Sequence, residues 1–145
     1  MKLLIGIDDS PHSRAAVDLV CRMVWPSGTH ALVVSVIPPA MPVHSEIHGS
    51  AEWMTRLHEH LVREHERVVA ATEGVLRASG IEASSQLMHG DARVELLDAA
   101  RSHQPDLLVV GSHGRTGLAK LILGSVAHHV VTHAECSVLV VKVRP

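Results

Sequence analysis

Five short apolar runs alternate with helix-forming stretches, and this alternation constrains the fold of the chain more than any other feature. A continuous apolar run is typical of a strand buried on both faces of a sheet. A helical stretch between two such strands favours a parallel connection. The sequence therefore predicts an α/β fold, a doubly wound five-stranded parallel sheet with helices on both faces. The expected strands are Leu3–Ile7, Ala31–Ile37, Ile81–Met88, Asp106–Val110 and Ser137–Val143.

Four helices are expected between these strands. Ser10 and Pro11 indicate the first start, because serine caps helices and proline suits the first turn. That helix ends before Gly28, and a loop over 38–50 precedes a long helix that ends at Gly80. The apolar face of the long helix is predicted from its 3.6-residue period to hold Met54, Leu57, Leu61, Val68, Thr72, Val75 and Leu76. Asp91 is expected to cap a third helix with Val94, Leu97 and Ala100 on its apolar face, and the fourth spans Ser125–His133.

Length and composition indicate one globular domain over residues 1–145. The chain is 46% hydrophobic and 19% charged, which suits a packed core and argues against disorder. The net charge of -2 predicts no basic face, and therefore no nucleic acid as partner. No apolar stretch reaches the roughly 18 residues of a membrane span, and the N-terminal run lacks a signal-peptide pattern. We expect a cytoplasmic protein with no membrane partner, in which Cys21 and Cys136 stay reduced.

The segment Gly111–Ala127, GSHGRTGLAKLILGSVA, carries the clearest chemical signal. Its glycines follow the spacing G-x2-G-x9-G-S directly after a predicted strand, where ligands bind in folds of this class. Glycines let backbone N–H groups surround an anion, and a helix N-terminus favours phosphate. Arg115 and Lys120 add positive charge. These features predict a phosphate site, whereas the alternative is that the glycines only form turns. The chain has neither a Walker A lysine motif nor a G-x-G-x-x-G after its first strand.

This glycine spacing, together with IGIDDSPHS near the start and SVLVVKV near the end, resembles the universal stress protein family over the whole chain. The resemblance implies the strand order 3-2-1-4-5, binding of ATP, and a homodimer formed through the edge strand Val138 to Val143. It also implies that Asp8 holds the ribose and that the backbone of Val36 meets adenine. The positions that match the phosphate-binding residues are Gly111, Gly114, Gly124 and Ser125, with Val126 after them.

The function implied by the resemblance is a nucleotide-responsive stress-signalling module that holds ATP, with or without Mg²⁺. Two alternatives stay open. One is a slow ATPase or self-phosphorylating enzyme with Ser112, Thr116 or Ser125 as acceptor, and the other is a dimerisation module without nucleotide. Cyclic AMP stays open as the ligand, and so does the choice between Asp8 and Asp9 at the ribose.

Thirteen histidines raise the question of a metal site. His129 and His133 have one-face helical spacing, and His58, His60 and His65 cluster among glutamates. No HExxH motif or neighbouring cysteine joins them, so we expect solvated side chains and no metal. His113 lies inside the glycine segment, where it either donates to a phosphate or faces solvent. Arg115 is the cation expected to pair with phosphate.

Overall fold

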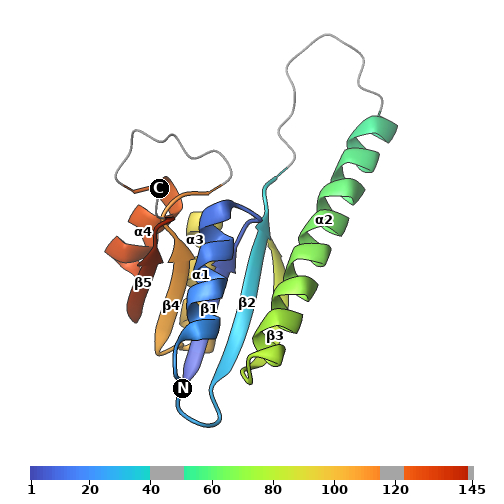
Figure 1. The fold of residues 1–145 in the computed structure, drawn as a ribbon. Helices are drawn as coiled ribbons and strands as arrows, with labels where there is room; N and C mark the ends of the chain where they lie inside the picture. Colours follow the sequence, from blue (N-terminus) through green and yellow to red (C-terminus); the bar gives the residue numbers. More distant parts are fainter. Residues whose placement is uncertain (40–50, 115–122, 144–145) are drawn as a thin grey trace.

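All five strands form one parallel sheet in the order β3-β2-β1-β4-β5 (Figure 1). The computed structural model describes residues 1–39, 51–114 and 123–143. The predicted fold class and the strand order implied by the family resemblance are both confirmed. The ends of the strands differ by one or two residues from the expected ones. The strands are β1 (Lys2–Ile7), β2 (His30–Ile37), β3 (Glu82–His89), β4 (Leu107–Gly111) and β5 (Ser137–Val141).

Four helices cover the two faces of the sheet: α1 (Pro11–Arg22), α2 (Ala51–Ala78), α3 (Ala92–His103) and α4 (Ser125–His133). One core layer lies under α1 and α2, and the other lies under α3 and α4 (Figure 1). Both predicted caps are present, since the side chain of Ser10 accepts from the Ser13 N–H and that of Asp91 accepts from the Arg93 N–H. None of the helices in the described part of the chain combines the length and apolar character needed to cross a membrane.

Two of the predicted helix faces are partly wrong. In α3, Val94 is 50% exposed, while the buried residues are Leu96, Leu97, Ala99 and Ala100. Successive residues turn by about 100°, and Val94 therefore lies opposite this buried group. In α2, Leu57 and Val75 are exposed, and Val69 and His65 are buried instead. The expectation that His65 faces solvent is therefore wrong.

The sheet topology creates a crevice between β1 and β4. β1 pairs with β2 on one side and with β4 on the other. The chain leaves β1 toward α1 on one face of the sheet, whereas it leaves β4 toward α4 on the other face. Divergent connections of this kind leave an opening at the carboxyl ends of the two strands, where α/β proteins bind ligands.

Candidate functional site

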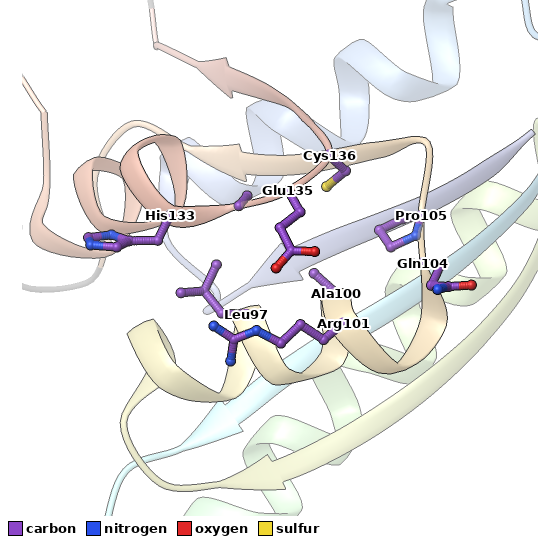
Figure 2. Close-up of a pocket in the computed structure, with 9 residues that line it drawn as sticks. Leu97, Ala100, Arg101, Gln104, Pro105, His133, Glu135 and Cys136 are labelled. Carbon is purple, nitrogen blue, oxygen red and sulfur yellow. The ribbon is translucent and has the colours of Figure 1, made fainter.

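A cleft of about 250 Å³ lies between the C-terminal ends of α3 and α4 (Figure 2). Pro105 and Cys136 line it and lie within two residues of the starts of β4 and β5, so the cleft lies at the amino end of the sheet. Its polar lining residues Arg101, Gln104, His133 and Glu135 are all exposed. Among the described residues, no predicted site residue lines this cleft.

A larger cavity, of about 520 Å³, opens at the carboxyl ends of β1, β2 and β4. Its volume falls within the range of about 300–1,000 Å³ that is usual for small-molecule sites. The structure brings together seven of the eight predicted site residues in its lining, and the eighth, Arg115, lies outside the described residues. The seven are Asp8, Val36, Gly111, Gly114, Gly124, Ser125 and Val126.

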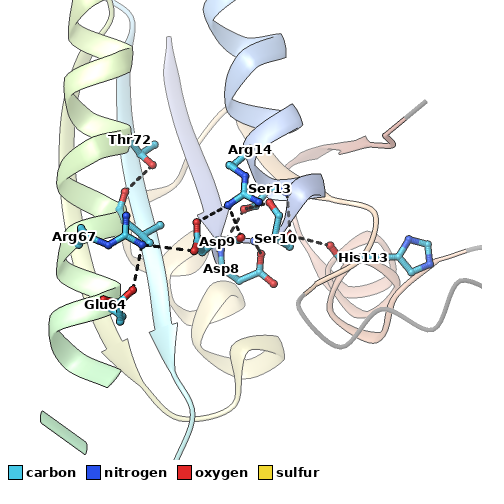
Figure 3. A network of polar contacts seen from close by, with 10 residues as sticks. Asp8, Asp9, Ser10, Ser13, Arg14, Glu64, Arg67, Thr72 and His113 are labelled. Carbon is cyan, nitrogen blue, oxygen red and sulfur yellow. Dashed lines mark hydrogen bonds and ion pairs between the residues drawn. The ribbon is translucent and has the colours of Figure 1, made fainter. Parts of the chain in front are cut away.

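The structure separates the two aspartates that follow β1. Asp8 lines the cavity, and its Oδ1 accepts a hydrogen bond of 3.1 Å from the Ser10 N–H. Asp9 has a left-handed backbone with φ of 61°, and its carboxylate pairs with Arg14 at 2.7 Å (Figure 3). Arg67 of α2 lies 3.7 Å from the other oxygen of Asp9. Asp9 therefore ties the turn to α1 and α2, which leaves Asp8 as the carboxylate of the cavity.

The glycines of the G-x2-G-x9-G-S segment have different neighbours. A Cβ atom on Gly111 would lie 2.7 Å from the backbone carbon of His12 and 2.8 Å from the Ser13 nitrogen. Gly111 is thus required for the close packing of β4 against α1. A Cβ atom on Gly114 would lie 2.6 Å from Asp8 Oδ2, which shows how closely the segment approaches that carboxylate. Packing accounts for Gly111, and the approach to the cavity accounts for Gly114.

The N-terminus of α4 faces the cavity. Gly124 is its N-cap residue, and no described side chain caps it. The Gly124 N–H donates to the Ser112 carbonyl at 2.7 Å, which fixes the start of the helix against the end of β4. The first turn carries no acidic residue, and Ser125, Val126 and Ala127 all line the cavity. Free N–H groups at a helix start favour an anion at this end of the cavity.

The three hydroxyl acceptors named for a self-phosphorylating enzyme lie in different places. Ser125 lines the cavity. Ser112 is buried, and its hydroxyl contacts His12 of α1 outside the cavity lining. Thr116 lies outside the described residues. Of the two described candidates, Ser112 and Ser125, only Ser125 lines the cavity and could accept a phosphoryl group there.

The sequence interpretation missed several lining residues, among them Ser13, Pro38, Gly90 and His65. His65 of α2 is 5% exposed, and its Nδ1 lies 2.8 Å from the Ser35 hydroxyl. That hydroxyl donates to the Ile7 carbonyl at 3.0 Å, so His65 Nδ1 must carry the proton in the contact. The signal was present, since His65 lies four residues from Val69 on the buried face of the helix.

The electrostatics around the cavity are simple in the described part of the chain. The titratable lining residues are Asp8, His65 and His113, and no lysine or arginine joins them there. Asp91 caps α3 beside the cavity, and its hydrogen bonds from the Arg93 side chain and backbone lower its pKa from 3.8 to about 2. Among the described residues, no three histidine, cysteine, aspartate or glutamate side chains form a group that could hold a metal ion.

Comparison with known proteins places the chain among universal stress proteins. The model of the "Universal stress protein family" matches residues 1–142. The universal stress protein MJ0531 of Methanocaldococcus jannaschii is 29% identical over 143 residues, which cover 97% of this chain and 81% of that protein. The solved structure of the protein MJ0577 superimposes with a TM-score of 0.87 at 25% identity, covering 99% of this chain and 96% of the other.

Structures with the same fold have been solved with adenine nucleotides bound. One is a universal stress protein family protein from Arabidopsis thaliana with AMP, at a TM-score of 0.72 and 18% identity, covering 99% of this chain and 92% of the other. Others are universal stress proteins in complex with cAMP and, from Archaeoglobus fulgidus, with dAMP. Structural relatives of this chain thus bind adenine nucleotides.

Proposed function

The chain belongs to the universal stress protein family, and from this premise we propose that it binds ATP in the cavity at the carboxyl ends of β1, β2 and β4. One observation carries the proposal. A carboxylate, an aliphatic wall and the N-terminus of α4 line the same cavity, at the crevice between β1 and β4. These groups match the ribose, the base and the phosphates of a nucleotide in turn.

In this proposal Asp8 accepts hydrogen bonds from the ribose hydroxyls. The carboxylate lines the cavity, and a hydrogen bond from the Ser10 N–H orients it. Adenine lies against Val36 and pairs with its backbone. The chain contains no Phe or Tyr, and the lining residues Val34, Pro38 and Leu96 are proposed to form an aliphatic pocket for the base.

The phosphates lie against Gly114, Gly124, Ser125 and Val126, where backbone N–H groups and the dipole of α4 favour negative charge. Arg115, outside the described residues, is proposed to add a cation. Asp8 is the single carboxylate among the described lining residues and is engaged with ribose in this proposal. Mg²⁺ would be held by the phosphates of ATP rather than by a carboxylate cage of the protein, and it would partly neutralise their charge.

The signalling role follows from holding the nucleotide rather than consuming it, so that the bound nucleotide reports the state of the cell.

We also propose that the protein is a homodimer through β5. This strand forms an edge of the sheet and carries the apolar run Val138 to Val141. An uncovered apolar edge favours aggregation, and two-fold pairing with a second copy covers it. Light scattering should give twice the monomer mass of 15.6 kDa, and a monomer mass would contradict this interface.

Calorimetric titration with ATP, AMP, cyclic AMP and GTP tests the proposed ligand. We expect one ATP per chain, weaker binding of GTP, and a loss of at least about tenfold in affinity for Asp8→Asn, because the amide replaces a charged acceptor. Asp9→Asn is the matched control, since Asp9 pairs with Arg14 and not with the cavity. If cyclic AMP bound more tightly than ATP, the ligand would be cyclic AMP and not ATP. Equal effects of the two substitutions would contradict the assignment of Asp8.

A further inference from the structure

The backbone groups of β2 alternate between its two neighbouring strands. Successive residues of an extended strand direct their N–H and C=O groups to opposite edges. The His30 N–H donates to the Met1 carbonyl at 2.9 Å, on the side of β1. The Gly90 N–H, just after β3, donates to the Ile37 carbonyl at 3.0 Å, on the opposite side. By this alternation the N–H and C=O of Val36 lie on the β1 side of the strand, as those of His30 do.

β1 ends before it reaches the Val36 carbonyl. The ladder between the two strands stops where Ile7 pairs with Ser35. If β1 continued by two residues, the Asp9 N–H would lie opposite that carbonyl, but Asp9 has a left-handed backbone with φ of 61° and the chain turns into α1. In the described part of the chain, no backbone hydrogen bond extends the ladder to the Val36 carbonyl, and Val36 lines the cavity. The carbonyl is therefore an acceptor at the crevice between β1 and β4.

The next position on the same edge of β2 is residue 38, which is a proline. A residue before proline is held in an extended conformation, so Ile37 keeps residue 38 on the edge that Val36 occupies. An ordinary residue there would offer an N–H beside the Val36 carbonyl, but proline has none. Pro38 also lines the cavity. This edge of β2 thus offers the cavity an acceptor without the donor that would normally follow it.

An acceptor without a neighbouring donor discriminates between purine bases. Adenine carries an exocyclic amine, which donates, between the ring nitrogens N1 and N7, which only accept. Guanine carries the oxygen O6 in place of this amine, and O6 repels another carbonyl because both only accept. A shift of guanine that brings its N1–H to the Val36 carbonyl would leave O6 against Pro38, where it finds no N–H. Because an unpaired polar group in a binding site costs affinity, this edge disfavours guanine in both positions.

We propose that Pro38 determines the base specificity of the cavity: it withholds an N–H, so the Val36 carbonyl recognises the base through its exocyclic amine alone. The inference rests on the proposed function, because it needs the base of a nucleotide at the end of β2. The ligands it selects are nucleotides of 6-aminopurines. The ring itself packs against the lining residues Val34 and Leu96, and its nitrogens N1 and N7 contribute no hydrogen bond from this edge.

Calorimetric titration of the wild-type protein with base-modified triphosphates tests this specificity. The probes are ATP, 1-deaza-ATP, 7-deaza-ATP and the purine riboside triphosphate in which a hydrogen replaces the amine. We expect both deaza analogues to bind as tightly as ATP, because each lacks a ring nitrogen that receives no hydrogen bond from β2. The analogue without the amine should bind about tenfold more weakly, because it leaves the Val36 carbonyl unpaired. Tenfold weaker binding of either deaza analogue, or equal binding of ATP and the analogue without the amine, would overturn the inference.

Pro38→Ala restores an N–H to this edge of β2. In this variant ATP should bind about twofold to tenfold more tightly than one of the two deaza analogues, because the ring nitrogen beside the amine gains a donor. A ratio of affinities within one protein cancels any general effect of the substitution. Pro39→Ala is the matched control, since it makes the same change outside the cavity lining and should leave both ratios as in wild type.

The outcomes separate this inference from the proposed function. Unchanged ratios in a folded Pro38→Ala protein that binds ATP would overturn the inference alone. Absence of any ATP binding to the wild-type protein would overturn the proposed function and this inference with it.

Discussion

Replacing Gly114 with alanine should weaken nucleotide binding without unfolding the protein. The added Cβ would lie 2.6 Å from Asp8 Oδ2, whereas ordinary contacts begin at 3.4 Å, so the carboxylate must move by about 0.8 Å. The backbone of Gly114 is not in the left-handed region, so alanine introduces no strain of its own. The displaced carboxylate would lose a charged hydrogen bond of about 1.5–3 kcal/mol to the ribose. The Kd for ATP should therefore rise by roughly tenfold to a hundredfold.

Calorimetric titration and urea unfolding of the same samples separate binding from stability. Gly74→Ala in α2 is the matched control, since nothing lies within 4 Å of the added Cβ. It should raise the free energy of unfolding by about 0.8–1.0 kcal/mol through helix propensity and leave ATP affinity unchanged. Wild-type affinity in a folded Gly114→Ala protein would refute the reasoning that Asp8 and Gly114 meet at the ribose.

Three further predictions concern packing, pH and turnover. Gly111→Ala should lower the free energy of unfolding by about 1–3 kcal/mol, because its Cβ would lie 2.7 Å from the α1 backbone, and urea unfolding measures this. Asp91 stabilises the fold above its ordinary pKa of 3.8, and this contribution should disappear as pH falls through its folded pKa of about 2. The stability difference between wild type and Arg93→Ala should therefore shrink between about pH 5 and about pH 2, and a constant difference would contradict that coupling. ATP should be hydrolysed far more slowly than the ~1–100 s⁻¹ of kinases, since Asp8 is the single carboxylate in the described lining. Phosphate release within seconds in a single-turnover assay would contradict this.

The sequence predicted the sheet well because its strands are short apolar runs bounded by strong turn and cap residues. Ser10 and Asp91 fixed two helix starts through chemistry that acts locally. The faces of α2 and α3 were harder, because a period alone does not say which of two apolar stripes meets the sheet. His65 shows the difficulty, since a histidine beside glutamates is usually solvated, yet here Ser35 satisfies its buried Nδ1.

The positions of the site residues relative to one another needed the fold. Asp8 and Asp9 are adjacent and chemically identical, and the fold distinguishes them, because Arg14 and Arg67 pair with Asp9 whereas the Ser10 N–H donates to Asp8. Likewise, the sequence grouped Gly111 with the phosphate-binding glycines, although its close contact with α1 already explains why it cannot carry a side chain. The contacts of Ser112 with His12 join residues that are 100 positions apart, which no local pattern indicates.

Native mass spectrometry of the freshly purified protein shows whether the cavity holds a nucleotide. We expect a species heavier by one adenine nucleotide per chain, with ATP identified after denaturation. This species should be depleted in Asp8→Asn and retained in Asp9→Asn. Chains without nucleotide that also fail to bind added ATP, ADP or AMP would contradict the claim that the cavity beside Asp8 and α4 is a nucleotide site.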